Sequence, residues 1–527
     1  MKRNFNQKKG ITLIALVVTI IVLLLLAGVS ISMLTGQNSV LKRAGQAKEK
    51  TDQSQLEEEI KLGLTETNIE KNVQGTETDI EEYLKKIDNA QVEKKQPDAW
   101  YVTKGNASAT VYKNGDIMQG KVDIWDGNSS SAPAIENGNW QIRTAAELKF
   151  FADFVNNANQ LTDSQKSEIA SKGYSENDYV IDDNTVVNLL ADIDLGARQS
   201  DGVKTYGTEW IPIGPTTDEK FTGTFDGNNH TIRGVFVKQT GKFAGIFGNS
   251  DTIKNLKIAD SYIYSSDSCV GGIVGALREG TLENCENIDT QVIGKYSVGG
   301  IVGQFSSGCI EIKNCKNSGN ILTRGKPEGG YSQAGGIVGA AVSKIINCNN
   351  IGNVTGEGND VGGVVGIAST SSTVQDCYNT GNVTGGNYVG GVVGVAVNIV
   401  TKCYNTGTIV SKGIGGTGGI VGTCTSKPQD ISLCFNAGTV QAPEYAGGIS
   451  GYLGAQGSAA KETKCYNKGK VICTQSNTGR GEIIGRMASD ATVTNSYYFT
   501  NETSRYGVGA IRTGGDLEAK RKGTQKT

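Results

Sequence analysis

The stretch that decides the fold runs from residue 361 to residue 416. It reads VGGVVGIASTSSTVQDCYNTGNVTGGNY over 361–388 and VGGVVGVAVNIVTKCYNTGTIVSKGIGG over 389–416. The two halves have the same length, and both begin with VGGVVG and carry CYNTG, which starts at Cys377 in the first half and at Cys403 in the second. Self-similarity at a fixed period of this length indicates a repeat architecture.

The same two-part pattern continues in both directions from this stretch, at intervals of 26–36 residues. The first part is a pair of glycines, two apolar residues and a further glycine. Its degenerate end copies are FAGIFG, which ends at Gly248, and RGEIIG, which ends at Gly485. The second glycine of the pair in the close copies is Gly272, Gly300, Gly336, Gly363, Gly391, Gly419 and Gly448.

The second part is Cys-x-Asn-x-Gly, and Ser496 replaces the cysteine in the last copy. A further apolar pair follows most copies. The cysteines are Cys285, Cys315, Cys348, Cys377, Cys403, Cys434 and Cys465. The asparagines are Asn287, Asn317, Asn350, Asn379, Asn405, Asn436 and Asn467.

Each unit therefore supplies roughly three short apolar runs separated by turns, and these runs are too short for helices and rich in Val and Ile. This pattern predicts a right-handed parallel β-helix with one unit per coil. Coils about 4.8 Å apart would give about nine layers and a rod segment of about 40 Å. We expect the glycines at bends or close approaches, the asparagines in a stacked amide ladder, and the cysteines in the core as small apolar residues.

A metal or disulfide role for the cysteines is the competing interpretation. The chain has 11 cysteines, all after residue 268, and none forms the C-x2-C pair that zinc sites use. An odd total also argues against complete pairing. We therefore predict a buried row of thiols, with no metal and no cofactor.

The Gly-Gly-apolar-apolar-Gly units resemble the GLUG repeat of bacterial surface proteins, and WIPIG…FTGTFDGNNHTI resembles the segment that often precedes it. The resemblance covers about residues 140–500 and implies a solenoid rather than one particular activity. Some secreted metallopeptidases carry GLUG repeats, but their H-E-x-x-H zinc motif is impossible here because His230 is the single histidine.

The amino terminus predicts export. Residues 11–31 are almost wholly apolar and long enough to cross a bilayer, and basic residues precede them. The short basic leader ending in Gly10 resembles the class III signal of type IV prepilins and pseudopilins. That resemblance implies that a prepilin peptidase cuts after Gly10 and methylates Ile11. Ala15 stands where major pilins carry a glutamate, which leaves open whether the protein joins other pilins in a filament.

Composition shifts along the chain predict its organisation. A charged helix follows the apolar run, and Asn114-Gly115 marks a hairpin. The predicted parts are a leader at 1–10, a pilin-like helix at 11–72, a helix plus hairpin at 73–125, a linker at 126–139, the first coils and their helical cap at 140–244, the repeats at 245–500 and a tail at 501–527.

The net charge of −2 gives no reason to expect a nucleic-acid partner. Asp192, Asp194, Asp226 and His230 form an imaginable metal or catalytic group, but Asp and Asn in such places are more often turn residues. A β-helix lyase or hydrolase would need clustered carboxylates, whereas the acids of the repeat, Asp360 and Asp376 among them, occupy no fixed coil position.

We therefore expect a non-enzymatic protein on the cell surface. It would resemble a minor pilin or an adhesin, with its leader in the cytoplasm before processing and its bulk outside. Its ligand would be a glycan or a protein, bound along a solenoid face or at the loop Arg324–Gln333. A purely structural spacer is the alternative. A stripe of clustered aromatic side chains would favour the ligand-binding hypothesis over the spacer. The candidates for such a stripe are Tyr331, Tyr378, Tyr388, Tyr404 and Tyr445.

Overall fold

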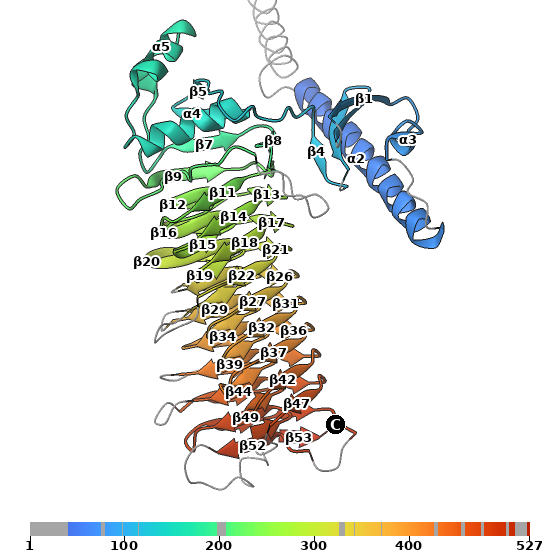
Figure 1. The fold of residues 1–527 in the computed structure, drawn as a ribbon, viewed down its shortest axis with the longest axis vertical. Coiled ribbons are helices and arrows are strands. Elements are labelled where there is room, and N and C mark those ends of the chain that lie inside the picture. Colours follow the sequence, from blue (N-terminus) through green and yellow to red (C-terminus); the bar gives the residue numbers. More distant parts are fainter. Residues whose placement is uncertain are drawn as a thin grey trace, which may run out of the picture. The chain divides into compact units, whose positions relative to one another are not determined.

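The repeat units of the chain stack in register as a parallel β-solenoid in the computed structural model (Figure 1). The chain divides into two units, Met1–Val122 and Asp123–Thr527. The residues described are 40–74, 80–96, 99–113, 115–197, 207–325, 332–341, 343–369, 372–425, 430–454, 459–475, 479–501, 505–511 and 524–526.

The first unit is a long helix with a small antiparallel sheet. The helix α2 (Val40–Gln74) confirms the charged helix expected after the apolar run. A hydrophobic core of Leu56, Ile60, Leu84, Trp100 and Val102 joins the helices to the sheet. The remaining elements are α3 (Ile80–Leu84) and the strands β1 (Gln91–Gln96), β2 (Ala99–Lys104), β3 (Ala107–Tyr112) and β4 (Ile117–Gln119), in the order β1-β2-β3-β4.

One coil of the second unit contains five short strands, so the predicted three runs per unit are too few. In the coil that starts at residue 361, these are β28 (Val361–Gly362), β29 (Val365–Ala368), β30 (Thr373–Gln375), β31 (Tyr378–Asn379) and β32 (Val383–Gly385). The two extra strands are the double glycine and the Tyr-Asn pair, which are too short and too polar to register as apolar runs.

Three of the ladders are simple parallel sheets. The 12-stranded sheet contains β8 (Ile193–Asp194), β10 (Thr231–Arg233), β13 (Lys257–Ala259), β17 (Glu286–Ile288), β21 (Lys316–Asn317), β26 (Asn349–Asn350), β31, β36 (Tyr404–Asn405), β41 (Phe435–Asn436), β46 (Tyr466–Asn467), β51 (Ser496–Tyr498) and β53 (Thr524–Lys526). The 9-stranded sheet contains β11 (Phe236–Gln239), β14 (Tyr262–Ser265), β18 (Gln291–Gly294), β22 (Ile321–Thr323), β27 (Val354–Gly356), β32, β37 (Ile409–Ser411), β42 (Val440–Ala442) and β47 (Val471–Cys473). The 8-stranded sheet contains β15 (Ser268–Gly271), β19 (Tyr296–Gly299), β23 (Ala334–Gly335), β28, β33 (Val389–Gly390), β38 (Thr417–Gly418), β43 (Ala446–Gly447) and β48 (Arg480–Gly481).

The remaining strands form a side of the solenoid that divides into two ladders after its first coils. The undivided part contains β5 (Ala134–Glu136), β6 (Asn139–Ile142), β7 (Val186–Leu189), β9 (Phe221–Asp226), β12 (Phe247–Lys254), β16 (Val274–Glu283) and β20 (Val302–Lys313). One ladder continues with β24 (Val338–Ala341), β29, β34 (Val393–Ala396), β39 (Val421–Cys424), β44 (Ser450–Leu453), β49 (Ile484–Met487) and β52 (Val508–Ile511). The other continues with β25 (Lys344–Ile346), β30, β35 (Ile399–Thr401), β40 (Asp430–Ser432), β45 (Lys461–Thr463) and β50 (Thr492–Thr494).

A helix closes the amino-terminal end of the solenoid core, as expected. Helix α4 (Ala145–Asn156) begins with a capping box between Thr144 and Glu147. Its Phe151 ring lies 5.4 Å from Trp140 and 5.4 Å from Phe221, so the helix continues the solenoid core. The sequence did not indicate the following α5 (Asp163–Ser171) or the short η1 (Glu176–Asp178). This cap covers an end that would otherwise expose strand edges to other chains.

Two predicted boundaries are wrong. Residues 126–139 are not a linker, because β5 lies within them and Ala132 is buried in the solenoid core. The stretch 501–527 is not only a tail, because β52 and β53 extend two of the ladders. In both places polar and turn-forming residues surround a short strand, and the polarity concealed it.

The predicted leader and apolar span, with Gly10, Ile11 and Ala15, lie outside the described residues. Within the described part of the chain, no helix is long and apolar enough to cross a membrane.

Candidate functional site

Six of the seven repeat asparagines form the predicted ladder, whereas the Asn287 amide donates to the Gly300 carbonyl instead. Each side-chain amide from Asn317 to Asn436 donates to the side-chain oxygen of the next asparagine, over distances of 2.7–2.9 Å. The same amides also donate to the glycine carbonyl two residues further along. The ladder residues Asn317, Asn350, Asn379, Asn405, Asn436 and Asn467 are all buried. Buried amides with partners on both sides stabilise the register of the coils.

The second glycine of each pair has a steric reason to be glycine. A Cβ atom on Gly391 would lie 2.0 Å from the Gly419 carbonyl oxygen and 2.6 Å from the amide carbon of Asn405. Gly336, Gly363, Gly419 and Gly448 meet the next coil and their own asparagine in the same way. Glycine and asparagine are thus two halves of one packing unit, which the sequence spacing alone did not reveal.

The repeat cysteines line up in the core as free, buried thiols. Each thiol donates to the carbonyl two residues before it, as Cys403 does to Thr401 over 3.2 Å. Burial raises the pKa of the Cys315 and Cys403 thiols. Across the described residues, no group of three or more His, Cys, Asp or Glu side chains could hold a metal ion.

The acids of the first coils act as turn residues. Asp194 accepts the Gly196 amide, and Asp226 accepts the Asn228 amide. Asp192 accepts the Thr231 amide and lies 3.0 Å from the Nδ1 atom of His230. Asp194 and Asp226 thus complete hydrogen bonds within their own turns, whereas Asp192 joins its turn to the neighbouring coil.

An aromatic row lies on the outer face of the 12-stranded sheet. It consists of Tyr378, Tyr404, Phe435, Tyr466 and Tyr497, which pair in register from coil to coil. The Tyr378 and Tyr404 rings are parallel with their centroids 4.7 Å apart, and the Phe435 and Tyr466 rings are stacked at 5.7 Å. Because stacked rings cover each other's faces, this row mainly ties neighbouring coils together.

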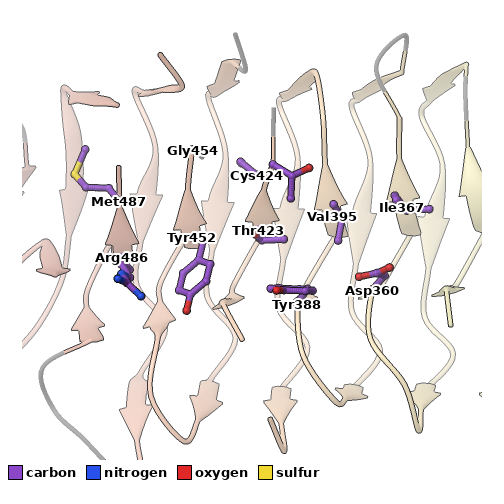
Figure 2. A pocket seen from close by; sticks show the side chains of 11 residues that line it. Asp360, Ile367, Tyr388, Val395, Thr423, Cys424, Tyr452, Gly454, Arg486 and Met487 are labelled. Carbon is purple, nitrogen blue, oxygen red and sulfur yellow. The ribbon is translucent and has the colours of Figure 1, made fainter. Parts of the chain in front are cut away.

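A groove of about 440 Å³ runs along another side of the same coils (Figure 2). One wall comes from the residue that precedes each strand of the 8-stranded sheet. From Asp360 onward, these residues are Asp360, Tyr388, Gly416, Tyr445 and Gly479. Asp360 and Tyr388 have positive φ values of 60° and 50°, a backbone conformation that is uncommon for side chains other than glycine and asparagine.

The floor of the groove is a register column of the long ladder. It contains Ile367, Val395, Thr423, Tyr452 and Arg486 in five successive coils. The residues range from apolar at the Asp360 end to aromatic and cationic at the other end. Tyr452 fits against Gly416, where a Cβ atom would lie 2.9 Å from the Tyr452 ring.

Arg486 stands at the far end of the groove from Asp360 (Figure 2). Its guanidinium lies 4.9 Å from the Tyr445 ring centroid and 5.8 Å from that of Tyr452. Cation–π contacts of this kind hold the guanidinium in a fixed orientation. Arg486 lies four coil steps from the coil of Asp360, which is about 19 Å, so the two charged groups do not neutralise each other.

Asp360 is the most unusual group in the groove. Its side chain is 1% exposed, and both carboxyl oxygens lack a hydrogen-bond partner in the structure. Burial raises the pKa of Asp360 to about 7. A buried polar group without partners is costly, and such groups gather where a ligand supplies the missing bonds.

Three of these residues stand out in the sequence, but separately. Tyr388 and Tyr445 are aromatic candidates for a binding stripe, and Asp360 is one of several acids without a fixed coil position. All three occupy one position, two residues before the first glycine of the pair. The signal that was missed is therefore a variable position next to an invariant part of the repeat. The loop Arg324–Gln333 is described only in part, and Tyr331 lies outside the described residues.

Comparisons with known proteins support the repeat. The GLUG motif matches residues 357–384, which include Asp360. A stretch of 123 residues, 23% of the chain, is 36% identical to halomucin of Haloquadratum walsbyi, of whose length it spans 1%. The crystal structure of a candidate immunoglobulin A1 protease from Bacteroides ovatus aligns over 74% of this chain and 84% of its own, with 16% identity and a TM-score of 0.27. A TM-score this low establishes no shared arrangement. The chain is thus a β-solenoid that carries the GLUG motif.

Proposed function

We propose that this chain is an exported bacterial surface protein that resembles a minor pilin or an adhesin and binds an extracellular ligand in the groove. The observation that carries the proposal is Asp360, a buried carboxyl group without partners in a groove that also presents Tyr388, Tyr452 and Arg486. Concave sites with a few convergent polar groups are where proteins bind small ligands. The stacked coils form a rigid support for such a site.

The route to the surface rests on the amino terminus. Processing after Gly10 by a prepilin peptidase would leave Ile11 as the first residue, and residues 11–31 would then anchor the chain in the membrane or in a pilus. The sequence of this segment supports the proposal. Ala15 in place of the pilin glutamate favours an anchored protein over a filament subunit.

The competing functions predict other features. A pure spacer has no use for a buried carboxyl group without partners, because replacing it by an apolar residue would cost nothing. A polysaccharide lyase or hydrolase needs an acid and a base close to one bond. Among the described residues that line the groove, Asp360 is the single carboxylate. Binding without catalysis therefore fits the groove better.

The test is made on cells that express the full chain together with a prepilin peptidase. We expect mass spectrometry to find N-methylated Ile11 at the mature terminus, and proteases added outside the cells to digest the protein. Cells should adhere to an array of immobilised glycans and matrix proteins. The double variant Tyr388→Ala, Arg486→Gln should abolish adhesion, whereas Arg143→Gln, on the cap, should preserve it. Protein that stays protected inside the cell, or equal adhesion by the double variant, would refute the proposal.

A further inference from the structure

We propose that the groove of Asp360, Tyr388, Tyr452 and Arg486 binds an acidic oligosaccharide, with about one sugar ring per coil and an acidic group at Arg486. This inference rests on the proposed function, because it names the ligand of the same groove.

The length of the groove fits a short, straight chain of sugars. The floor residues Ile367, Val395, Thr423, Tyr452 and Arg486 recur once per coil, at a spacing of about 4.8 Å. A pyranose ring in an extended chain advances by about the same distance. The four steps from Asp360 to Arg486 therefore accommodate roughly four rings.

The polar groups that face the groove belong to side chains, which favours a sugar over a peptide. The floor strands β34, β39 and β44 pair with a neighbouring strand on both sides, as do the wall strands β33, β38 and β43. Their backbone hydrogen bonds therefore run from coil to coil. A peptide that binds by strand addition needs a row of free backbone groups at a sheet edge. Hydroxyl groups of a sugar, in contrast, can bond to the Tyr388, Thr423 and Asp360 side chains.

The two ends of the groove require different groups on the ligand. At one end lies the carboxyl group of Asp360, whose buried oxygens lack partners and could accept bonds from ligand hydroxyl groups once the side chains around them move aside. At the other end the guanidinium of Arg486 is held against Tyr445 and Tyr452, in the planar geometry that binds a carboxylate or a sulfate. A neutral sugar would not use this cation, and a short anion would not reach Asp360.

The middle of the groove suits the faces of sugar rings. Val395 is 6% exposed and lies between Ile367 and Thr423 in the floor column, and Tyr388 stands in the wall of the same coil. The apolar C–H face of a sugar ring can pack on such a surface while its hydroxyl edges reach the walls. Aromatic side chains bind in this way because they combine a large apolar surface with a polar tip.

The experiment measures binding to the purified full chain in detergent by isothermal titration calorimetry. The acidic probes are tetragalacturonic acid, a heparin-derived tetrasaccharide and a sialylated tetrasaccharide. The controls are the methyl ester of tetragalacturonic acid, cellotetraose and a set of acidic hexapeptides. We expect at least one acidic tetrasaccharide to bind, and to bind at least about tenfold more tightly than the neutral controls.

The variants separate the two ends of the groove. Arg486→Gln should weaken binding of the acidic probe by at least about tenfold and leave the weak binding of a neutral control unchanged. Tyr388→Ala should weaken both by a similar factor, and Arg143→Gln should change neither. Circular dichroism and the melting temperature would verify that each variant is folded.

Three results would overturn the inference: no binding of any acidic tetrasaccharide, equal affinity of Arg486→Gln and the natural protein for the acidic probe, or binding of the hexapeptides alone. In each case, adhesion of cells that still depends on Tyr388 would leave the proposed function standing with a different ligand. Loss of that dependence would reject both.

Discussion

In the 12-stranded sheet, seven coils place a cysteine at one position and an asparagine two residues later. In the column that continues into the groove wall, five successive coils place Ser297, Gln333, Asp360, Tyr388 and Gly416 at one position. The first region repeats its side chains because each packs against its own copy. The second varies them, because its members, from the buried Ser297, Asp360 and Gly416 to the half-buried Gln333 and Tyr388, do not pack against identical copies. In this solenoid, uniform positions hold the stack together, and the variable positions are those on which the proposed recognition rests.

In the uniform region, one added methyl group should cause the largest loss of stability. Gly391→Ala would place Cβ against the Gly419 carbonyl and the Asn405 amide, so the coils must separate. We expect a loss of about 3 kcal/mol in the free energy of unfolding. Denaturant titration of the full chain measures it. Gly241→Ala is the control, since its Cβ would meet nothing closer than 3.5 Å. Equal stability of the two variants would contradict the packing described for the double glycine.

The asparagine ladder should show the next largest effect. Asn405→Ala removes four buried hydrogen bonds: those of its side chain with Asn379 and Asn436, and those with the amide and carbonyl of Gly407. Their loss should cost about 2 kcal/mol. The exposed Asn353→Ala, measured in the same titration, should cost only a few tenths. A cost for Asn405→Ala no larger than that of the control would show that the ladder does not stabilise the stack.

One coil breaks the uniformity of the core itself. Glu462 lies in a column between Ile431 and Val493, accepts a 2.6 Å hydrogen bond from Ser450 and is buried. Burial raises the pKa of Glu462 from 4.5 to about 8. Because the folded state holds the proton more tightly, this group's contribution is complete below pH 4.5 and declines as the pH rises to about 8.

The measurement is the free energy of unfolding between pH 5 and pH 8. The natural protein should lose stability with a slope approaching about 1.4 kcal/mol per pH unit from this group, and Glu462→Gln should remove that part of the slope. Glu311→Gln, a change at a half-buried surface acid, is the control and should preserve it. Identical slopes for Glu462→Gln and the natural protein would mean that Glu462 is not buried as described.

A substitution in the groove should change the free energy of unfolding least and the ligand affinity most. Because the pKa of Asp360 is raised to about 7, its carboxyl group is largely charged at pH 8. Its oxygens still lack hydrogen-bond partners at that pH. Asp360→Asn should therefore keep or raise the free energy of unfolding, by about 1 kcal/mol or less, while ligand affinity falls. Calorimetric unfolding and a binding titration on the same sample give both values. A large loss of stability would place Asp360 among the structural positions and remove the contrast between the two regions.

The sequence was sufficient to predict the uniform region. Cys403 and Asn405 could be assigned to core columns because a stacked repeat brings like residues together. The sequence was not sufficient to predict the five strands of each coil, because two-residue strands such as Tyr378–Asn379 are too short to show a periodic pattern. It was also not sufficient to predict which residues line the groove. Asp360 and Arg486 come from different parts of the unit, and only the path of the chain around the coil brings their columns together.

The thiol row has a consequence for folding. Before the coils stack, the seven repeat cysteines are accessible to solvent, and an oxidant can join any two of them. A disulfide between coils that are not neighbours would exclude both from the final register. The folded structure protects each thiol by burying it. In an oxidising medium, correct folding therefore requires each coil to join the stack faster than its thiol is oxidised. In such a medium, the chain would need either rapid growth of the stack or a reducing partner until the last coil is in place.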